Sequence, residues 1–199
     1  MNELMTDYLV PSVTEMLDAM RVVNESGSKL YFWGGVIDYG VDFNEPCTEA
    51  QIAELEEKMG YSLPKDYKEF LRYTNGMNFS GWHVSSKIYS LDELYSYREC
   101  IESPFPDEYL VIADCAEGTM WPGFYMAEKG KQMVFVAEMG DEYFKCLNCD
   151  FRIFLDRFLV TYGAPYWEWA ATVTDIDQVV IKDIGPQIVD AFYMVVGHE

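Results

Sequence analysis

Hydrophobic and polar positions alternate with a helical period near the start of the chain. Ser12 and Glu15 have the spacing of a capping box, and apolar residues recur on one side over 13–23. This pattern predicts an N-terminal helix over about 12–26. The next stretch, over 30–36, is aromatic and apolar and is typical of a strand.

Two short helices are predicted next to each other after this strand. Thr48 and Gln51 form a second capping-box pair, and apolar residues follow on one helical face. Gly60 stands where a left-handed C-cap is needed, and Pro64 suits the first turn of the following helix. An Asn-Gly pair at 75–76 is a strong turn signal that ends this second helix.

The second half of the chain has the pattern of strands. Compact apolar runs over 109–113 and 133–137 have the length of buried strands, and glycines and prolines separate them. Asp150 can cap a last core helix, which continues with a regular apolar stripe. Beyond that helix, the residues over 179–181 predict a short strand and those over 186–195 a brief helix.

This order of elements predicts an α+β protein rather than a parallel βαβ array. We expect one domain over 1–199, with a central, mostly antiparallel sheet flanked by N-terminal helices and a closing C-terminal helix. The composition agrees, because a chain of 199 residues that is 50% apolar and 16% aromatic can bury a core.

Charge narrows the choice of partners. The chain has 14 basic and 34 acidic residues, which leaves a formal net charge of −20 at pH 7. Such a chain repels phosphate backbones and anionic lipid surfaces, so we expect neither nucleic acid nor a membrane as a partner. A basic protein fits better, although acidity can also serve solubility alone.

Residues suited to catalysis or metal binding are sparse. The five cysteines suggest no paired framework, and without a secretory leader the sequence indicates a reduced, cytoplasmic protein. Cys146 and Cys149 have the spacing of a metal or redox pair, but a structural zinc site needs four ligands and the sequence offers no second pair. His83 and His198 lie in no nucleophile motif, and no phosphate-binding loop occurs. We therefore expect no catalytic residue, cofactor or metal.

The predicted helix pair over 48–76 reads T-E-A-Q-I-A-E-L-E-E-K-M-G-Y-S-L-P-K-D-Y-K-E-F-L-R-Y-T-N-G. Its distinctive positions are Ile52, Leu55, Glu56, Leu63, Pro64, Asp66, Tyr67, Phe70, Leu71, Asn75 and Gly76. In these positions the chain resembles the SUKH superfamily, which includes the fungal Smi/Knr-type cell-wall regulators and many bacterial immunity proteins. The resemblance implies the same α+β fold.

Weaker matches extend the resemblance along the chain. The stretch 88–94 is similar to the family's next strand and its exit, 109–118 to a strand with an acidic-glycine turn, and 151–159 to the closing helix. The resemblance covers about 45–160 and leaves a C-terminal extension over about 164–199.

The motif residues themselves have a structural interpretation. The apolar ones form the inner faces of two helices. Glu56 and Asp66 can close the bend between the helices by accepting backbone N–H bonds or by pairing with Lys58, Lys65 or Lys68. The motif therefore identifies a fold and does not point to a catalytic centre.

Acidic stretches and aromatic residues supply the candidate binding surface. The stretches 30–57 and 99–128 each hold seven acids and no Lys or Arg. They form either two solvated faces or a directional field that steers a cationic partner. Trp121 and Pro122 are expected in a bulky turn, where an interface anchor could lie. The candidate partner-binding residues are Trp82, Asp114, Glu117, Trp121, Asp141 and Glu142.

These observations lead to two main hypotheses. The first is a non-enzymatic immunity protein that neutralises a cognate bacterial toxin, a basic domain, through an acidic surface that contains aromatic residues. The second, which the fungal relatives suggest, is an intracellular regulator or scaffold of cell-wall synthesis or stress signalling. A small-molecule hydrolase or metal enzyme is a third alternative, and the oligomeric state is left open.

Overall fold

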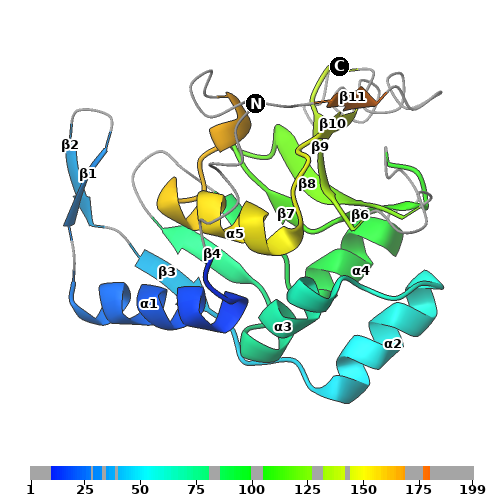
Figure 1. Ribbon diagram of the computed structural model, residues 1–199, viewed down its shortest axis with the longest axis horizontal. Coiled ribbons are helices and arrows are strands. Elements are labelled where there is room, and N and C mark those ends of the chain that lie inside the picture. The colour runs from blue at the N-terminus through cyan, green and yellow to red at the C-terminus, as the bar shows by residue number, and fades with distance from the viewer. Residues whose placement is uncertain are drawn as a thin grey trace, which may run out of the picture.

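The computed structural model describes residues 10–27, 29–32, 35–38, 40–80, 86–99, 105–126, 132–141, 144–168 and 177–179. The helices of this part are α1 (Val13–Glu25), α2 (Glu49–Met59), α3 (Lys65–Tyr73), α4 (Leu91–Glu99) and α5 (Phe151–Val160), with a 3₁₀ turn at Tyr166–Glu168. The strands are β1 (Lys29–Phe32), β2 (Gly35–Asp38), β3 (Gly40–Phe43), β4 (Met77–Ser80), β5 (Ser86–Ile88), β6 (Tyr109–Val111), β7 (Ala113–Asp114), β8 (Met120–Tyr125), β9 (Val134–Glu138), β10 (Phe144–Cys146) and β11 (Asp177–Val179) (Figure 1).

Two sheets meet where the chain passes from one to the other. The first has the strand order β3-β4-β5-β7 and the second the order β11-β10-β9-β8-β6, and the described strands pair antiparallel. Ile112 separates β6 from β7; its N–H donates to Pro122 O at 2.9 Å and its carbonyl accepts from Tyr89 N at 2.8 Å. Ile112 thus joins the two sheets, and the predicted α+β fold is confirmed.

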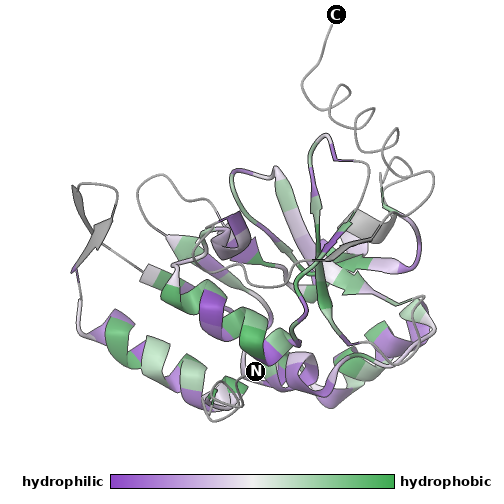
Figure 2. Cartoon of the chain, turned by 45° about the horizontal axis from the view of Figure 1, so that its top comes forward, coloured by the Kyte–Doolittle hydropathy of each residue, from purple (hydrophilic) through white to green (hydrophobic). Residues whose placement is uncertain are grey.

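Aromatic side chains fasten α3 and α5 to the second sheet. Tyr67 of α3 is fully buried, and its ring centroid lies 5.3 Å from that of Phe124 in β8 and 5.0 Å from that of Phe151 in α5. Edge-to-face pairs of this kind add to the stabilisation that comes from burial. The helices carry hydrophilic residues between the hydrophobic ones, as Figure 2 shows, because only one side of each faces the core.

Local signals explain where the helices begin and end. Ser12 N donates to Glu15 Oε2 at 2.9 Å and Glu15 N to Ser12 Oγ at 3.3 Å, which is a complete capping box at the start of α1. Thr48 and Gln51 form the same box at the start of α2, and the predicted cap at the start of α5 is also present. Gly60 ends α2 with a φ of +75°, a left-handed conformation that glycine adopts without strain.

Glu56 closes the bend between α2 and α3, as the sequence predicted. Its Oε1 atom accepts from Leu63 N at 2.7 Å, Ser62 Oγ at 2.8 Å and Lys68 Nζ at 2.9 Å. Partial burial by itself would raise the pKa of Glu56, but these hydrogen bonds together lower it below its usual value. The ionised carboxylate therefore stabilises the bend.

Asp66 connects α3 to a distant helix. Its Oδ2 atom accepts from Arg152 N, in the first turn of α5, at 2.8 Å, and its Oδ1 atom accepts from Tyr67 N at 3.0 Å. Asp66 accepts backbone N–H groups, as predicted, but its bond to Arg152 joins α3 to α5 and does not close the bend between α2 and α3. Burial raises the pKa of Asp66 although these bonds favour its charged form.

The stretch 30–36 differs from the sequence-based prediction, because it belongs to two strands, β1 and β2, whose hairpin stands apart from the other described elements in Figure 1.

The stretch 88–94 leaves β5 at Ile88, as its similarity to a strand and its exit implied, and then enters a helix, α4, that the sequence analysis did not predict. The physical reason is a third capping pair, in which Ser90 N donates to Glu93 Oε2 at 2.8 Å.

Trp121 and Pro122 lie in β8 rather than in the bulky turn that the sequence predicted. Proline is unusual in a central strand because it has no N–H for the ladder. Pro122 still takes part in the sheet, because its carbonyl accepts a hydrogen bond from Ile112 N and it lies opposite Val136 of β9. The strand therefore continues through both residues.

The C-terminal extension is described only in part. The predicted strand over 179–181 overlaps β11 at Val179, and β11 pairs with β10 so that Asp177 lies opposite Cys146. The remainder of that predicted strand and the predicted helix over 186–195 lie outside the described residues.

Candidate functional site

Acidic side chains gather around two turns, β7–β8, which links the two sheets, and β9–β10 of the second sheet. The β7–β8 turn and the β9–β10 turn meet through a hydrogen bond from Met139 N to Thr119 O at 2.9 Å. We call the surface around these turns the acidic edge. It consists of Glu93, Asp114, Glu117, Glu138, Asp141 and Glu168, with Lys87 and Lys145 among them.

Lys145 of β10 holds three of these carboxylates together. Its Nζ atom lies 2.6 Å from Glu138 Oε2, 3.2 Å from Glu168 Oε1 and 3.8 Å from Asp141 Oδ2. Burial raises the pKa of Glu138 even though Lys145 favours its ionised form, and the nearby acids add to the rise. One ammonium group thus compensates the charge of three carboxylates only in part.

Lys87 of β5 plays the same part at the other side of the acidic edge. Its Nζ atom lies 2.7 Å from Glu93 Oε1 and 4.0 Å from Asp114 Oδ2, and Tyr89 Oη donates to Asp114 at 3.0 Å. Burial raises the pKa of Asp114, although Tyr89 and Lys87 favour its charged form. Both lysines are therefore occupied by carboxylates of the chain itself, and the acidic edge keeps an excess of negative charge.

The buried thiol of Cys115 lies between the carboxylates around Lys87 and those around Lys145. Burial raises its pKa well above the usual value, and the charges of Asp114 and Glu138 raise it further. The thiol therefore remains protonated and is no nucleophile at neutral pH. Its environment also shows that Asp114 and Glu138 are close enough to act on one site.

The tip of the β7–β8 turn has an unusual backbone. Ala116 and Glu117 have φ values of +53° and +59°, and Gly118 follows with +76°. Left-handed backbone costs a residue other than glycine roughly 1–2 kcal/mol. Thr119 Oγ1 donates to Ala116 O at 2.8 Å and supports the turn. Glu117, which is the exposed residue of this turn, is thus held at the tip in a fixed conformation.

The structure brings together three of the predicted partner-binding residues and places a fourth in the adjoining strand β8. Asp114, Glu117 and Asp141 belong to the acidic edge, where Asp114 is the most constrained of the three. Trp121 is half-buried in β8; its ring centroid lies 5.4 Å from that of Phe105. Its Nε1 atom is buried and has no hydrogen-bond partner among the described residues. Trp121 therefore lies in a strand and not in the loop that the sequence predicted, and its role in binding a partner stays a prediction.

The other two predicted partner-binding residues, Trp82 and Glu142, lie outside the described residues. His83 and His198 also lie outside them. Within the described ranges, no group of three or more His, Cys, Asp or Glu side chains could hold a metal ion. No helix there has the length and apolar character to cross a membrane.

Cys146 and Cys149 are both buried, and neither forms a disulfide with a described residue. Burial raises the pKa of Cys149 to about 12, and its Sγ atom lies 3.7 Å from Tyr166 Oη. A thiol with so high a pKa is a poor nucleophile and a poor redox partner near neutral pH. The interpretation of this pair as two ordinary reduced cysteines agrees with this environment.

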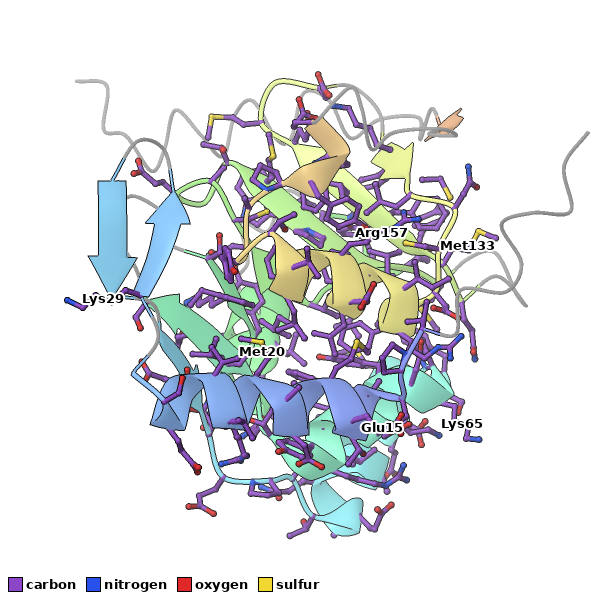
Figure 3. The ribbon with its side chains drawn as sticks, turned by 60° about the vertical axis from the view of Figure 1, so that its left-hand side comes forward. Glu15, Met20, Lys29, Lys65, Met133 and Arg157 are labelled. Carbon is purple, nitrogen blue, oxygen red and sulfur yellow. The ribbon has the colours of Figure 1, made fainter. Side chains whose placement is uncertain are left out.

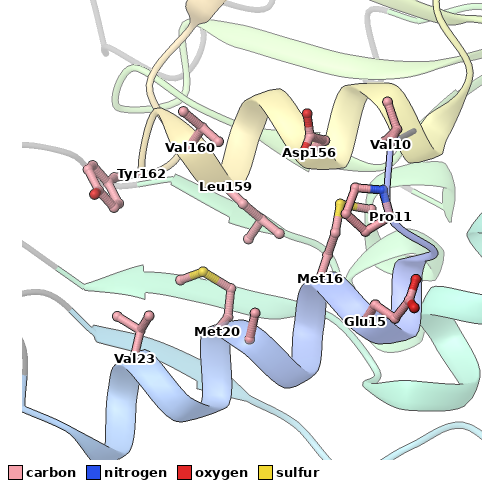
Figure 4. Close-up of a pocket in the computed structure, with 11 residues that line it drawn as sticks. Val10, Pro11, Glu15, Met16, Met20, Val23, Asp156, Leu159, Val160 and Tyr162 are labelled. Atoms are coloured by element: carbon pink, nitrogen blue, oxygen red, sulfur yellow. The ribbon is translucent and has the colours of Figure 1, made fainter. Parts of the chain in front are cut away.

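Sequence reasoning missed an open apolar groove between α1 and α5 (Figure 4). The groove has a volume of about 970 Å³. The apolar face of α1 was interpreted as core, but Met20 and Val23 are only partly buried. A signal was present in α5, where Val160 falls outside the apolar stripe of the helix and is 69% exposed.

The helix pair closed by Glu56, with α3 and α5 packed on an antiparallel sheet, defines a SUKH-type α+β protein. Sequence comparison gives the family: the family model described as the SMI1 / KNR4 family (SUKH-1) matches residues 46–157, more than half of the chain. The chain belongs to this family. The matched segment contains the bend at Glu56, the strands of the acidic edge and most of α5.

Two bacterial proteins are similar over a larger share of the chain. The chain is 30% identical over 129 residues to YnaB, an uncharacterised protein of Bacillus subtilis (strain 168), which covers 63% of this chain and 85% of YnaB. It is 27% identical over 186 residues to YobM, another uncharacterised protein of that strain, which covers 83% of this chain and 94% of YobM. The match to YobM extends beyond the segment that defines the family.

Proposed function

We propose that this protein is a non-enzymatic, cytoplasmic immunity protein that binds and neutralises a cognate basic toxin domain. Membership of the SMI1/KNR4 family supports a binding role, because the superfamily includes many bacterial immunity proteins. The observation that carries the proposal is the acidic edge, where turns far apart in the sequence present more carboxylates than lysines.

Recognition would proceed by electrostatic steering followed by docking. Lys87 and Lys145 are engaged by carboxylates of the chain, so the field outside the acidic edge is negative and attracts a cationic surface. Glu117 at the strained tip would meet the partner first. Trp121, half-buried in the adjoining strand, would contribute apolar contact once water has left the interface.

The first test is to purify the tagged protein from its own cells at low and high salt and to identify what co-elutes by mass spectrometry. A single basic toxin domain at a one-to-one ratio, released by salt, is the expected result. Recovery of wall-synthesis or signalling proteins, with no toxin, would contradict the immunity proposal and favour a regulator or scaffold.

The second test places the contact on the acidic edge. We expect the double variant Glu117→Lys and Asp141→Lys to slow association with the recovered domain about tenfold or more at low salt, with the difference shrinking as salt rises. The control Glu54→Lys and Glu57→Lys makes the same change of net charge on α2, where Glu54 is 58% exposed. Equal slowing by both variants would refute a specific role of the edge. Asp114 is left intact because it binds Tyr89.

A further inference from the structure

The groove between α1 and α5 is suited to bind an elongated apolar ligand, because apolar residues of both helices line it. On α1 it is lined by Met16, Ala19, Met20 and Val23, which follow the i, i+3, i+4, i+7 spacing of one helical face. The α5 wall ends in Leu159 and Val160, followed by Tyr162. Figure 4 shows Met20 pointing from α1 toward α5, and Figure 3 shows it in the same place between the two helices.

The groove is open to solvent and adaptable. Val160 at its rim is 69% exposed, so its side chain is available for contact with a ligand. From Met16 to Val23 the wall rises about 10 Å, which is two helical turns. Two methionines line it, and flexible thioether side chains suit a surface that adjusts to an incoming helix.

The charges of the groove select the kind of helix. Of the described residues that line it, Glu15 and Asp156 carry charge, both are acidic, and they lie on opposite walls. Hydrogen bonds from Ser12 lower the pKa of Glu15, so this carboxylate stays ionised. A second copy of the chain would bring a further charge of −20 against these acids, which disfavours self-association here.

We propose that this groove binds a cationic amphipathic helix of a partner protein, with the apolar stripe of that helix on the methionines and Val160. Lysine or arginine residues flanking the stripe would lie beside Glu15 and Asp156. The inference goes beyond the proposed function, because it concerns a second surface with its own recognition chemistry. It holds or fails independently of whether the acidic edge binds a toxin.

The test uses the full chain and a labelled synthetic peptide of about 14 residues, with leucines at i, i+3, i+4 and i+7 and lysines on the other positions. Fluorescence anisotropy should show saturable binding of this peptide. Two control peptides should each bind at least about tenfold more weakly. The first is a scrambled peptide of the same composition, which has no apolar face, and the second is an analogue with glutamates in place of the lysines.

Two valine variants locate the binding. Val160→Lys adds a cation to the groove rim and should weaken binding of the amphipathic peptide about tenfold or more. Val22→Lys is the matched control, because Val22 is 66% exposed on α1 but does not line the groove. Both exposed sites should tolerate lysine, which circular dichroism will check.

Several results would overturn the inference. Equal weakening by Val160→Lys and Val22→Lys would show that the peptide does not bind in the groove. Equally tight binding of the scrambled peptide would show that the acidic chain attracts any cationic peptide without recognising an apolar face. A dimer of the unaltered chain that Val160→Lys converts to a monomer would show that a second copy covers the groove. Loss of peptide binding in the variant Glu117→Lys and Asp141→Lys would place the peptide on the acidic edge instead.

Discussion

Replacing Gly123 with alanine is expected to destabilise the fold, because β8 has no room for a methyl group there. A Cβ atom at Gly123 would lie 2.5 Å from Leu110 O and 2.7 Å from Tyr109 Cζ, whereas ordinary contacts are 3.4–4 Å. Leu110 belongs to β6, which is paired with β8. Its carbonyl therefore cannot turn away as the end of a flexible side chain could.

The magnitude follows from two losses. Overpacking of a core costs about 1–3 kcal/mol. The Tyr109 hydroxyl donates to Trp121 O at 2.6 Å and lies 3.0 Å from Phe135 O, so moving its ring also breaks a buried hydrogen bond. That loss adds about 1 kcal/mol, and the sum of about 2–4 kcal/mol corresponds to a fall in Tm of roughly 5–15 °C for a chain of this size.

The assay is thermal and urea unfolding followed by circular dichroism, with Gly40→Ala as the matched control. Gly40 also lies in a strand, and its added Cβ would meet Ser80 Oγ at 2.7 Å, a side-chain end that can rotate. We expect the control to lose about 1 kcal/mol or less. A Gly123→Ala variant that melts within about 2 °C of Gly40→Ala would refute the steric reasoning.

Two further predictions concern single carboxylates. Glu56→Gln should cost about 1 kcal/mol at pH 7 relative to Glu57→Gln in urea unfolding, because Leu63 N loses a charged acceptor. The folded pKa of Glu56 is lowered, so this stabilisation is present above the unfolded pKa of about 4.3 and disappears as the pH falls through the folded value. A difference that persists in full at the lowest pH would contradict it. Glu117→Gly should raise stability by about 0.5–1 kcal/mol by relieving a φ of +59°, while slowing association with the partner. An unchanged or lower Tm would show that the turn is not strained.

The elements with local signals were predictable from the sequence. The helix boundaries at Ser12, Thr48 and Gly60 depend on residues only a few positions apart in the sequence. The structure contains both capping boxes and the glycine cap. The start of α4 has the same kind of local signal at Ser90 and Glu93, so this helix too was predictable from residues a few positions apart.

Features that depend on distant partners were not predictable in the same way. The strand through Pro122 exists because Ile112 and β9 supply partners that no local pattern reveals. The acids of the binding surface were visible as charge, but their gathering depends on the contact of Met139 with Thr119. The groove requires α1 and α5 to lie side by side, although more than a hundred residues separate them.

The acids of this chain differ in what their ionisation does to the fold. Glu56 has a lowered pKa, so its charged form stabilises the folded chain at neutral pH. Burial raises the pKa of Asp114 and Glu138, so the stability that their protonated forms contribute is lost as the pH rises through those values. Burial raises the pKa of Asp66 too, but its backbone bonds join α3 to α5 and explain why it is there. Asp114 and Glu138 contact the side chains of Tyr89 and Lys145 at the acidic edge, and a charge kept at a cost to stability is expected where it serves a partner.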